Sequence, residues 1–294
     1  MTFIRGPAIR AAARPVRLVA IAIVVLATTG IASFQALFAP SADLWERWQA
    51  HDPASTATID HSPWDRLLAA YVVRGRDGIA RFAYGRVTEA DRAALDAYVG
   101  GLAATPISRY ARPQQRAYWI NLYNALTVQV VLDHYPVASI MDIDISPGLF
   151  AKGPWDRKLL EIEGEPVSLN DIEHRILRPI WKDPRLHYAL NCASLGCPDL
   201  MQKAYTAALA ETLLDIAAHA YVNHPRGVRI DGDRLTVSSI YAWFQEDFGG
   251  SDKTIIAHLE RYAAPPLAAK LAAFDTIADH DYDWSLNDAA TAGL

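Results

Sequence analysis

Hydrophobic positions along this chain recur with the spacing of helices, and one segment is apolar nearly all round. That segment is 116–135, which predicts a long central helix that stops before Pro136. Other stretches show the helical period with polar residues on one side. They predict helices over 88–102, 170–177, 204–222, 240–244 and 253–262.

Two of these helices carry capping residues at their expected starts. Thr88 followed by Asp91 has the spacing of a helix cap, and Gly100–Gly101 mark the expected end of the same helix. Ser168 and Asp171 are the expected cap residues of the helix over 170–177.

Short alternating segments predict strands that pair locally. The segment 158–169 has the pattern of two strands around Gly164, and 228–238 that of a hairpin with an Asp-Gly turn. The segment 274–284 is expected to add a closing strand. Because helices outnumber strands, the fold class predicted is α+β, a mostly helical single domain with short antiparallel strands and hairpins over about 45–294.

The N-terminus has the pattern of a membrane anchor. Residues 1–17 contain four arginines and no acid, and 18–39 are 22 residues without a charge. At about 1.5 Å per residue, such a helix reaches roughly 33 Å, enough to cross a hydrocarbon core. We expect an uncleaved anchor with residues 1–17 in the cytoplasm. Small residues around 32–33 and 39–42 leave signal cleavage as the alternative.

The charge after residue 40 limits the partners. Without the four N-terminal arginines, 24 basic side chains stand against 33 acidic ones, a net charge of −9. Phosphate backbones repel such a surface, which excludes nucleic acid. The sequence predicts a single-pass membrane protein with a periplasmic domain, or a secreted or periplasmic protein if the signal is cleaved. Its expected partner is an envelope protein or a small-molecule ligand, and no cofactor is indicated.

The only two cysteines lie together in HYALNCASLGCPDL, residues 187–200. Outside the cytoplasm, Cys192 and Cys197 could close a six-residue loop as a disulfide. In the chain-entropy model this bridge would stabilise the fold by about 2 kcal/mol. The first interpretation is therefore a permanent structural disulfide.

The second interpretation is a reactive centre. Pro198 suits the first turn of a helix, which would place Cys197 at a positive helix end that favours a thiolate. His187 is near Cys192 in sequence, but spacing does not establish a Cys–His pair. A zinc site with these three residues and His174 is disfavoured, because no pair has a familiar ligand spacing.

Polar residues near this motif are open to two interpretations. Asn121 and Asn124 share one face of the apolar helix 116–135, where they either pin loop carbonyls or line a polar cleft. Glu173 and His174 form either an acid–base pair or, more in keeping with the first turn of a helix, a solvated or capping pair. Arg185 is placed to pair with Glu173 or bind a substrate carboxylate. Two aromatic–acidic segments, 243–249 and 282–288, are expected to lock elements together, with Asp247 as a residue that could orient a catalytic histidine.

Several of these segments, in this order, resemble the domain-of-unknown-function 547 family. The resemblance rests on RAYWINLYNALTV, YPVASI, SLNDIEHRILR, DPRLHYALNCASLGCPDL, AYT, SSIYAWFQEDFG and YDWSLN, and it covers roughly 60–287. Family membership implies no settled activity. Some eukaryotic members also carry glutaredoxin-like segments, which points to thiol chemistry by analogy only.

Two classes of function follow. The first is an envelope enzyme, a hydrolase, transferase or thiol–disulfide exchanger, that works through Cys192. Its other candidate catalytic residues are His187, His174 and Asn121, and its candidate polar cleft contains Asn124, Glu173, Arg185 and Asn191. The second is a non-enzymatic envelope module in which Cys192–Cys197 is a permanent disulfide.

Overall fold

The longest helix, α4 (Arg112–His134), runs through the larger hydrophobic core. A computed structural model describes residues 2, 40–148 and 152–291. Every residue of 117–128 is buried, in agreement with the all-round apolar pattern. The helix begins at a proline-containing first turn and ends at His134, with Tyr135 as its C-cap directly before Pro136. The predicted central helix is confirmed.

Two helices, α2 (Ser62–Tyr71) and α3 (Glu89–Ala103), belong to the same core. The Thr88 hydroxyl accepts the Asp91 backbone N–H at 3.1 Å, which confirms the predicted cap. The expected helix end at Gly100–Gly101 is wrong, because α3 continues through both glycines. Nothing lies within 4 Å of a side chain added at either glycine, so neither marks a tight turn.

The predicted helix over 170–177 is present as the widened turn η5 (Asp171–Leu177), which continues into α5 (Arg178–Trp181). Ser168 and Asp171 cap it reciprocally. The Asp171 N–H donates to the Ser168 hydroxyl at 3.2 Å, and the Ser168 N–H donates to the Asp171 carboxylate at 2.8 Å.

The other helices are α6 (Leu186–Ala189), α7 (Ala210–Val222), α8 (Ser239–Trp243), α9 (Asp252–Tyr262) and α10 (Pro265–Leu271). Helix α7 starts six residues later than the predicted 204. The reason is tertiary, since Asn121 and Asp65 bind the backbone of Tyr205 and Ala204 and hold this stretch outside the helix. Single 3₁₀ turns connect the elements: η1 (Glu46–Gln49), η2 (Tyr84–Arg86), η3 (Ile107–Arg109), η4 (Ile140–Asp142), η6 (Gln245–Phe248) and η7 (Ala289–Thr291).

The strands are short and form three small sheets. They are β1 (Val72–Arg74), β2 (Ala80–Phe82), β3 (Leu160–Ile162), β4 (Glu165–Val167), β5 (Val228–Asp231), β6 (Arg234–Ser238) and β7 (Asp279–Asp281). The predicted hairpins β3–β4 and β5–β6 are confirmed. The closing strand β7 has only three residues, and it pairs with β6 in parallel, whereas only antiparallel pairing was expected.

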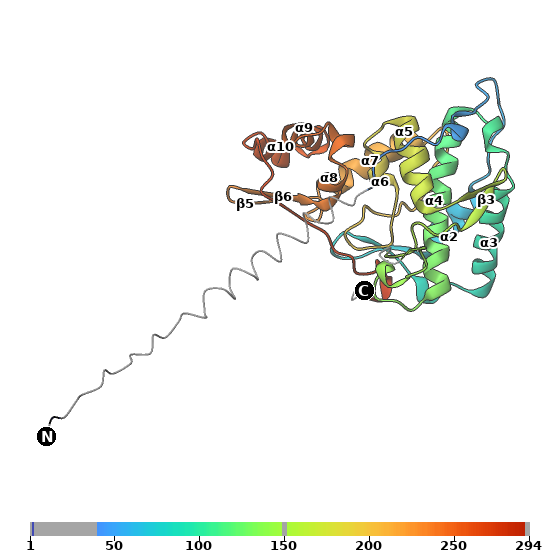
Figure 1. Cartoon of the computed structure of the whole chain (residues 1–294), viewed down its shortest axis with the longest axis horizontal. Helices are drawn as coiled ribbons and strands as arrows, with labels where there is room; N and C mark the ends of the chain where they lie inside the picture. The colour runs from blue at the N-terminus through green and yellow to red at the C-terminus, as the bar shows by residue number, and fades with distance from the viewer. Residues whose placement is uncertain (1, 3–39, 149–151, 292–294) are drawn as a thin grey trace. The chain divides into compact units, whose positions relative to one another are not determined.

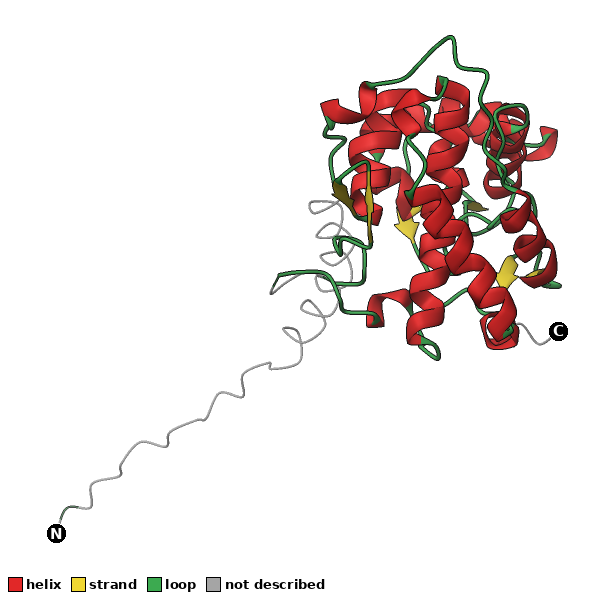
Figure 2. Ribbon diagram, turned by 90° about the vertical axis from the view of Figure 1, so that its right-hand side faces the viewer, coloured by secondary structure: helices red, strands yellow, loops and turns green. Residues whose placement is uncertain are grey.

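The described residues from 40 onward form one α+β unit with two cores. In Figure 1, α2, α3 and α4 lie at one end of this unit, α8, α9 and α10 at the other, and α6 and α7 between them. Figure 2 shows the few short strands among many helices. The predicted anchor over 18–39 falls outside the described residues. Within the part that the structure describes, no helix is both long and apolar enough to span a membrane.

Candidate functional site

The cysteine loop turns back on itself so that its two sulfurs meet. Cys192 Sγ and Cys197 Sγ, both free, lie 2.7 Å apart. Ala193 has a left-handed backbone (φ 60°), and its N–H donates to the Asn191 side chain at 2.9 Å. At the other end of the loop, the Cys197 N–H donates to the Ser194 carbonyl at 3.2 Å. The turn therefore holds the two sulfurs side by side.

The two sulfurs differ in access and in partners. Cys192 is half-buried, whereas Cys197 is only 3% exposed. The Cys192 Sγ lies 3.1 Å from the Tyr282 hydroxyl and 3.3 Å from the Ser194 hydroxyl. The Cys197 Sγ accepts the backbone N–H of Cys192 at 2.9 Å. Cys192 is therefore the more exposed residue of the pair.

These environments shift the two thiol pKa values in opposite directions. Burial raises the pKa of Cys192, and its contact with Cys197 adds to the effect. Burial also opposes ionisation of Cys197. Hydrogen bonds from Cys192, Tyr282 and the Cys192 backbone N–H outweigh it, so the pKa of Cys197 lies below its ordinary value. When the pair carries one negative charge, the buried sulfur holds it.

The sequence suggested a helix dipole as the origin of a Cys197 thiolate, and that explanation is wrong. No helix begins at Pro198, because the chain continues in an irregular segment from 198 to 205. The stabilising donor is instead a backbone N–H within the loop itself.

Three buried asparagines hold the loop in shape. The Asn124 side chain accepts the Asn191 N–H and donates to the Ala189 carbonyl, both at 2.9 Å. The Asn191 side chain donates to the Pro198 carbonyl at 2.7 Å and accepts from Asn287 at 3.1 Å. Asn124 thus pins the loop backbone, as the structural interpretation of this residue predicted.

The C-terminal segment 282–287 forms one wall of the cysteine loop. The N–H groups of Leu195 and Gly196 donate to carbonyls of this segment, both at 2.8 Å. A side chain at Gly196 would come within 2.7 Å of the Asp283 nitrogen, so only glycine allows this approach. The same segment delivers Tyr282 to the sulfurs.

Other candidate catalytic residues lie in different environments. The Asn121 amide is occupied by the Tyr205 backbone, to which it donates at 2.7 Å and from which it accepts at 3.0 Å. His187 Nε2 lies 2.7 Å from the Asp247 carboxylate, and Nδ1 lies 3.7 Å from the Glu173 carboxylate. In residues 40–148 and 152–291, no histidine makes a hydrogen bond to Cys192.

A cluster of buried ionisable side chains surrounds His187. Its ring stacks on Phe244 with centroids 4.4 Å apart, and Arg178 donates to the same Asp247 carboxylate at 2.6 Å. Arg178 also donates to His174 Nδ1 at 2.9 Å. Burial lowers the pKa of His174 to about 4, so that ring is neutral near pH 7. Asp247 does orient a histidine, as suggested, but this histidine faces two carboxylates and not a sulfur.

The structure corrects the interpretations of the Glu173–His174 pair and of Arg185. Glu173 and His174 were expected to form an acid–base pair or to be solvated or capping residues. Both are buried, at 9% and 6% exposure, which excludes the solvated role. Arg185 does not pair with Glu173. It bonds Asp183, Glu211 and Asp215 at 2.6–3.2 Å.

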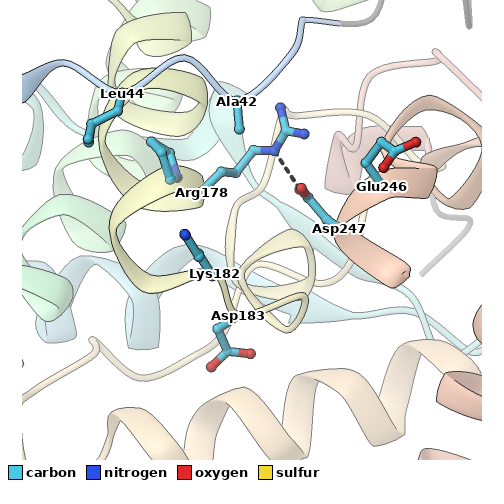
Figure 3. A pocket seen from close by; sticks show the side chains of 8 residues that line it. Ala42, Leu44, Arg178, Lys182, Asp183, Glu246 and Asp247 are labelled. Atoms are coloured by element: carbon cyan, nitrogen blue, oxygen red, sulfur yellow. Dashed lines mark hydrogen bonds and ion pairs between the residues drawn. The ribbon is translucent and has the colours of Figure 1, made fainter. Parts of the chain in front are cut away.

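A pocket of about 480 Å³ opens beside this cluster and not at the sulfurs. Figure 3 shows the Arg178–Asp247 pair among the side chains that line it, together with Lys182 and Asp183. Its lining residues are Ala42, Leu44, Arg178, Pro179, Lys182, Asp183, Glu246 and Asp247. Neither cysteine lines this pocket.

Sequence reasoning missed Tyr282 and Asn287 as neighbours of the cysteine loop. The segment YDWSLND was expected only to join elements, and Tyr282 lies 90 residues from Cys192 along the chain. No local pattern signals such a contact. No set of three or more His, Cys, Asp or Glu side chains capable of holding a metal ion occurs among the residues that the structure describes.

A family model described as "Protein of unknown function, DUF547" matches residues 107–222. Over these residues the chain is similar to the DUF547 family. The suspected resemblance is thereby confirmed, over a shorter span than the expected 60–287. No curated protein and no solved structure matches the chain.

The DUF547 segment runs from η3 to the end of α7 and includes both cysteines and the asparagines at 121, 124 and 191. It also includes Glu173, His174, Arg185 and His187. Tyr282, Asn287 and Asp247 lie beyond it. The sulfur site is therefore built from the DUF547 segment together with the C-terminal segment 282–287.

Proposed function

We propose that this domain carries out thiol–disulfide exchange outside the cytoplasm, with Cys192 and Cys197 as the cycling pair. One observation carries the proposal: two adjacent sulfurs, one accessible and one buried, in a loop whose shape does not depend on a bond between them. The arginine-flanked uncharged segment 18–39 supports a location in the envelope, where disulfides persist.

The exchange takes two steps that balance in atoms and electrons. In the oxidised form, a substrate thiolate attacks Cys192 Sγ, the Cys192–Cys197 bond breaks, and its electron pair stays on Cys197 as a thiolate. A second substrate thiolate then attacks the substrate sulfur bound to Cys192, and Cys192 leaves and takes up a proton. The substrate dithiol has lost two electrons and the protein pair has gained them. A disulfide of another envelope protein or small molecule reverses both steps.

The contacts of Cys197 suit the role of leaving group. A thiol with a low pKa leaves faster from a disulfide. The Cys192 N–H, 2.9 Å from Cys197 Sγ, favours the thiolate that forms there. Cys192 is the sulfur that solvent reaches, so the attack and the departure fall on different atoms.

The geometry favours exchange over hydrolysis by a cysteine–histidine pair. The Cys192 sulfur contacts Ser194, Tyr282 and Cys197, none of which is a general base near pH 7. His187 is engaged by Asp247 and stacked on Phe244. An activated hydrolase nucleophile lies within hydrogen-bond reach of its base.

Reaction of the oxidised full chain with a peptide dithiol tests this proposal. We expect stoichiometric oxidation of the peptide, about a hundredfold faster than with glutathione disulfide at equal concentration, because Cys197 is the better leaving group. The readout is peptide mass after acid quench. No oxidation above the rate of glutathione disulfide, with the bridge intact throughout, would instead support the permanent disulfide.

A further inference from the structure

The pocket of about 480 Å³ has walls that are fixed by contacts within the domain. The segment 40–45 forms one wall, and backbone bonds attach it to η5. The Asp43 N–H donates to the His174 carbonyl at 3.0 Å, and the Trp45 N–H donates to the Arg175 carbonyl at 2.9 Å. The other walls come from α5 with the two residues after it, and from η6. The volume suits a small molecule, since ligand pockets measure about 300–1,000 Å³.

A buried arginine in the pocket lining has hydrogen-bond donors left over. Arg178 is only 6% exposed. Its Nε donates to Asp247 at 2.6 Å, and its Nη1 donates to the Pro40 carbonyl at 2.7 Å and to His174 Nδ1 at 2.9 Å. The two N–H groups on Nη2 have no acceptor among the described residues. Guanidinium N–H groups bind carboxylates and phosphates strongly, so Arg178 offers the pocket a donor for an anion.

Lys182 places a second positive charge in the same pocket, four residues after Arg178. Its ammonium group makes no ion pair or hydrogen bond with any residue that the structure describes. Its backbone is left-handed (φ 49°), a conformation that glycine adopts at lower cost and that often ends a helix. Glycine would therefore serve this turn at least as well, so the turn itself does not require the lysine side chain.

The acidic side chains of the pocket lining are compensated, with one exception. Asp247 pairs with Arg178, and Asp183 pairs with Arg185 at 2.7 Å. Glu246, on η6, is exposed and forms no ion pair with the described residues. The uncompensated charges of the lining are therefore one cation, on Lys182, and one anion, on Glu246. Figure 3 shows that these two residues come from different elements.

We propose that this pocket binds a small zwitterion, with a carboxylate or phosphate at one end and an ammonium group at the other. The anionic end accepts hydrogen bonds from Arg178 Nη2 and from the Lys182 ammonium group, and the cationic end donates to the Glu246 carboxylate. A ligand with only one of these charges leaves the opposite charge of the lining without a partner. The site is independent of the thiol exchange proposed above, because neither cysteine lines it.

Calorimetric titration of the full chain with five small probes tests this proposal. β-Alanine and O-phosphoethanolamine each carry an ammonium group and an acid joined by a two-carbon chain. Propionate, methyl phosphate and ethylamine carry one of these groups alone. We expect at least one of the two zwitterions to bind at least about tenfold more tightly than each probe with a single charged group. Absence of binding by both zwitterions, or equal affinity for the zwitterions and the other probes, would overturn the proposal.

Two variants separate binding from folding. Lys182→Gly should weaken binding of the zwitterion at least about tenfold, yet leave the midpoint of urea unfolding equal or higher, because glycine suits the left-handed backbone. Glu246→Gln should weaken binding by a similar factor and remove the preference over the anionic probes. Lys253→Ala, at an exposed lysine of α9 outside the pocket, is the matched control and should bind as the wild type does. Unchanged affinity in both Lys182→Gly and Glu246→Gln would overturn the assignment of this pocket.

Discussion

A Cys197→Ser variant is expected to trap a stable mixed disulfide on Cys192, whereas Cys192→Ser is expected to trap none. Cys192 is accessible, so it reacts with a peptide disulfide that carries a good leaving group. Without Cys197, no neighbouring thiolate displaces the peptide. In the Cys192→Ser variant, the remaining Cys197 is only 3% exposed, so the peptide disulfide does not reach it.

The difference in trapped adduct should be about a hundredfold, measured by intact mass after a fixed time. Both variants should remain folded, because Asn124, Asn191 and Asn287 hold the loop through bonds that involve no sulfur. Near-ultraviolet circular dichroism of both variants is the control that shows whether they are folded. Equal adducts on both variants, with both folded, would contradict the assignment of Cys192 as the accessible sulfur.

The free energy of unfolding is expected to fall by about 6 kcal/mol between pH 7 and pH 5. Burial lowers the pKa of His61, His174 and His258 from 6.5 to about 4. These histidines become protonated below about pH 6.5 in the unfolded chain, but only near pH 4 in the folded chain. The stabilisation is therefore complete above pH 6.5 and is lost as the pH falls toward 4, at about 2 kcal/mol for each histidine by pH 5.

Urea unfolding at several pH values measures this loss. His61→Gln should remove about a third of the pH dependence, and His219→Gln, at an exposed position, should leave it unchanged. A pH-independent stability between 7 and 5 would contradict the burial of neutral histidines.

Buried carboxylates act in a separate, more acidic window. Burial opposes ionisation of Asp247, but hydrogen bonds from His187 and Arg178 outweigh it and hold the pKa of Asp247 well below its usual range. The contribution of Asp247 to stability is therefore present above its ordinary pKa of 3.8 and is lost only as the pH falls below that value.

Local features of the fold could be predicted from sequence because the residues that decide them are neighbours. The caps at Thr88 and Ser168 each join residues three positions apart, and the β5–β6 hairpin follows from one Asp-Gly turn. The central helix follows from its composition alone.

The features that could not be predicted from the sequence depend on contacts between residues far apart along the chain. The start of α7 depends on Asn121 and Asp65, and the pairing of β7 with β6 joins segments about 40 residues apart. Tyr282 reaches Cys192 across 90 residues. Charged residues are rarely buried without partners, and the sequence does not show that Arg178 contacts His174 or that His187 contacts Glu173.

The reduction potential of the Cys192–Cys197 pair tests the central claim most directly. The full chain would be equilibrated in glutathione buffers of defined potential, its thiols alkylated, and its mass measured. We predict that both sulfurs titrate together and reversibly above about −270 mV, with the domain folded in both states. A pair that stays oxidised below about −300 mV, or opens only when the domain unfolds, would contradict exchange and identify a structural disulfide.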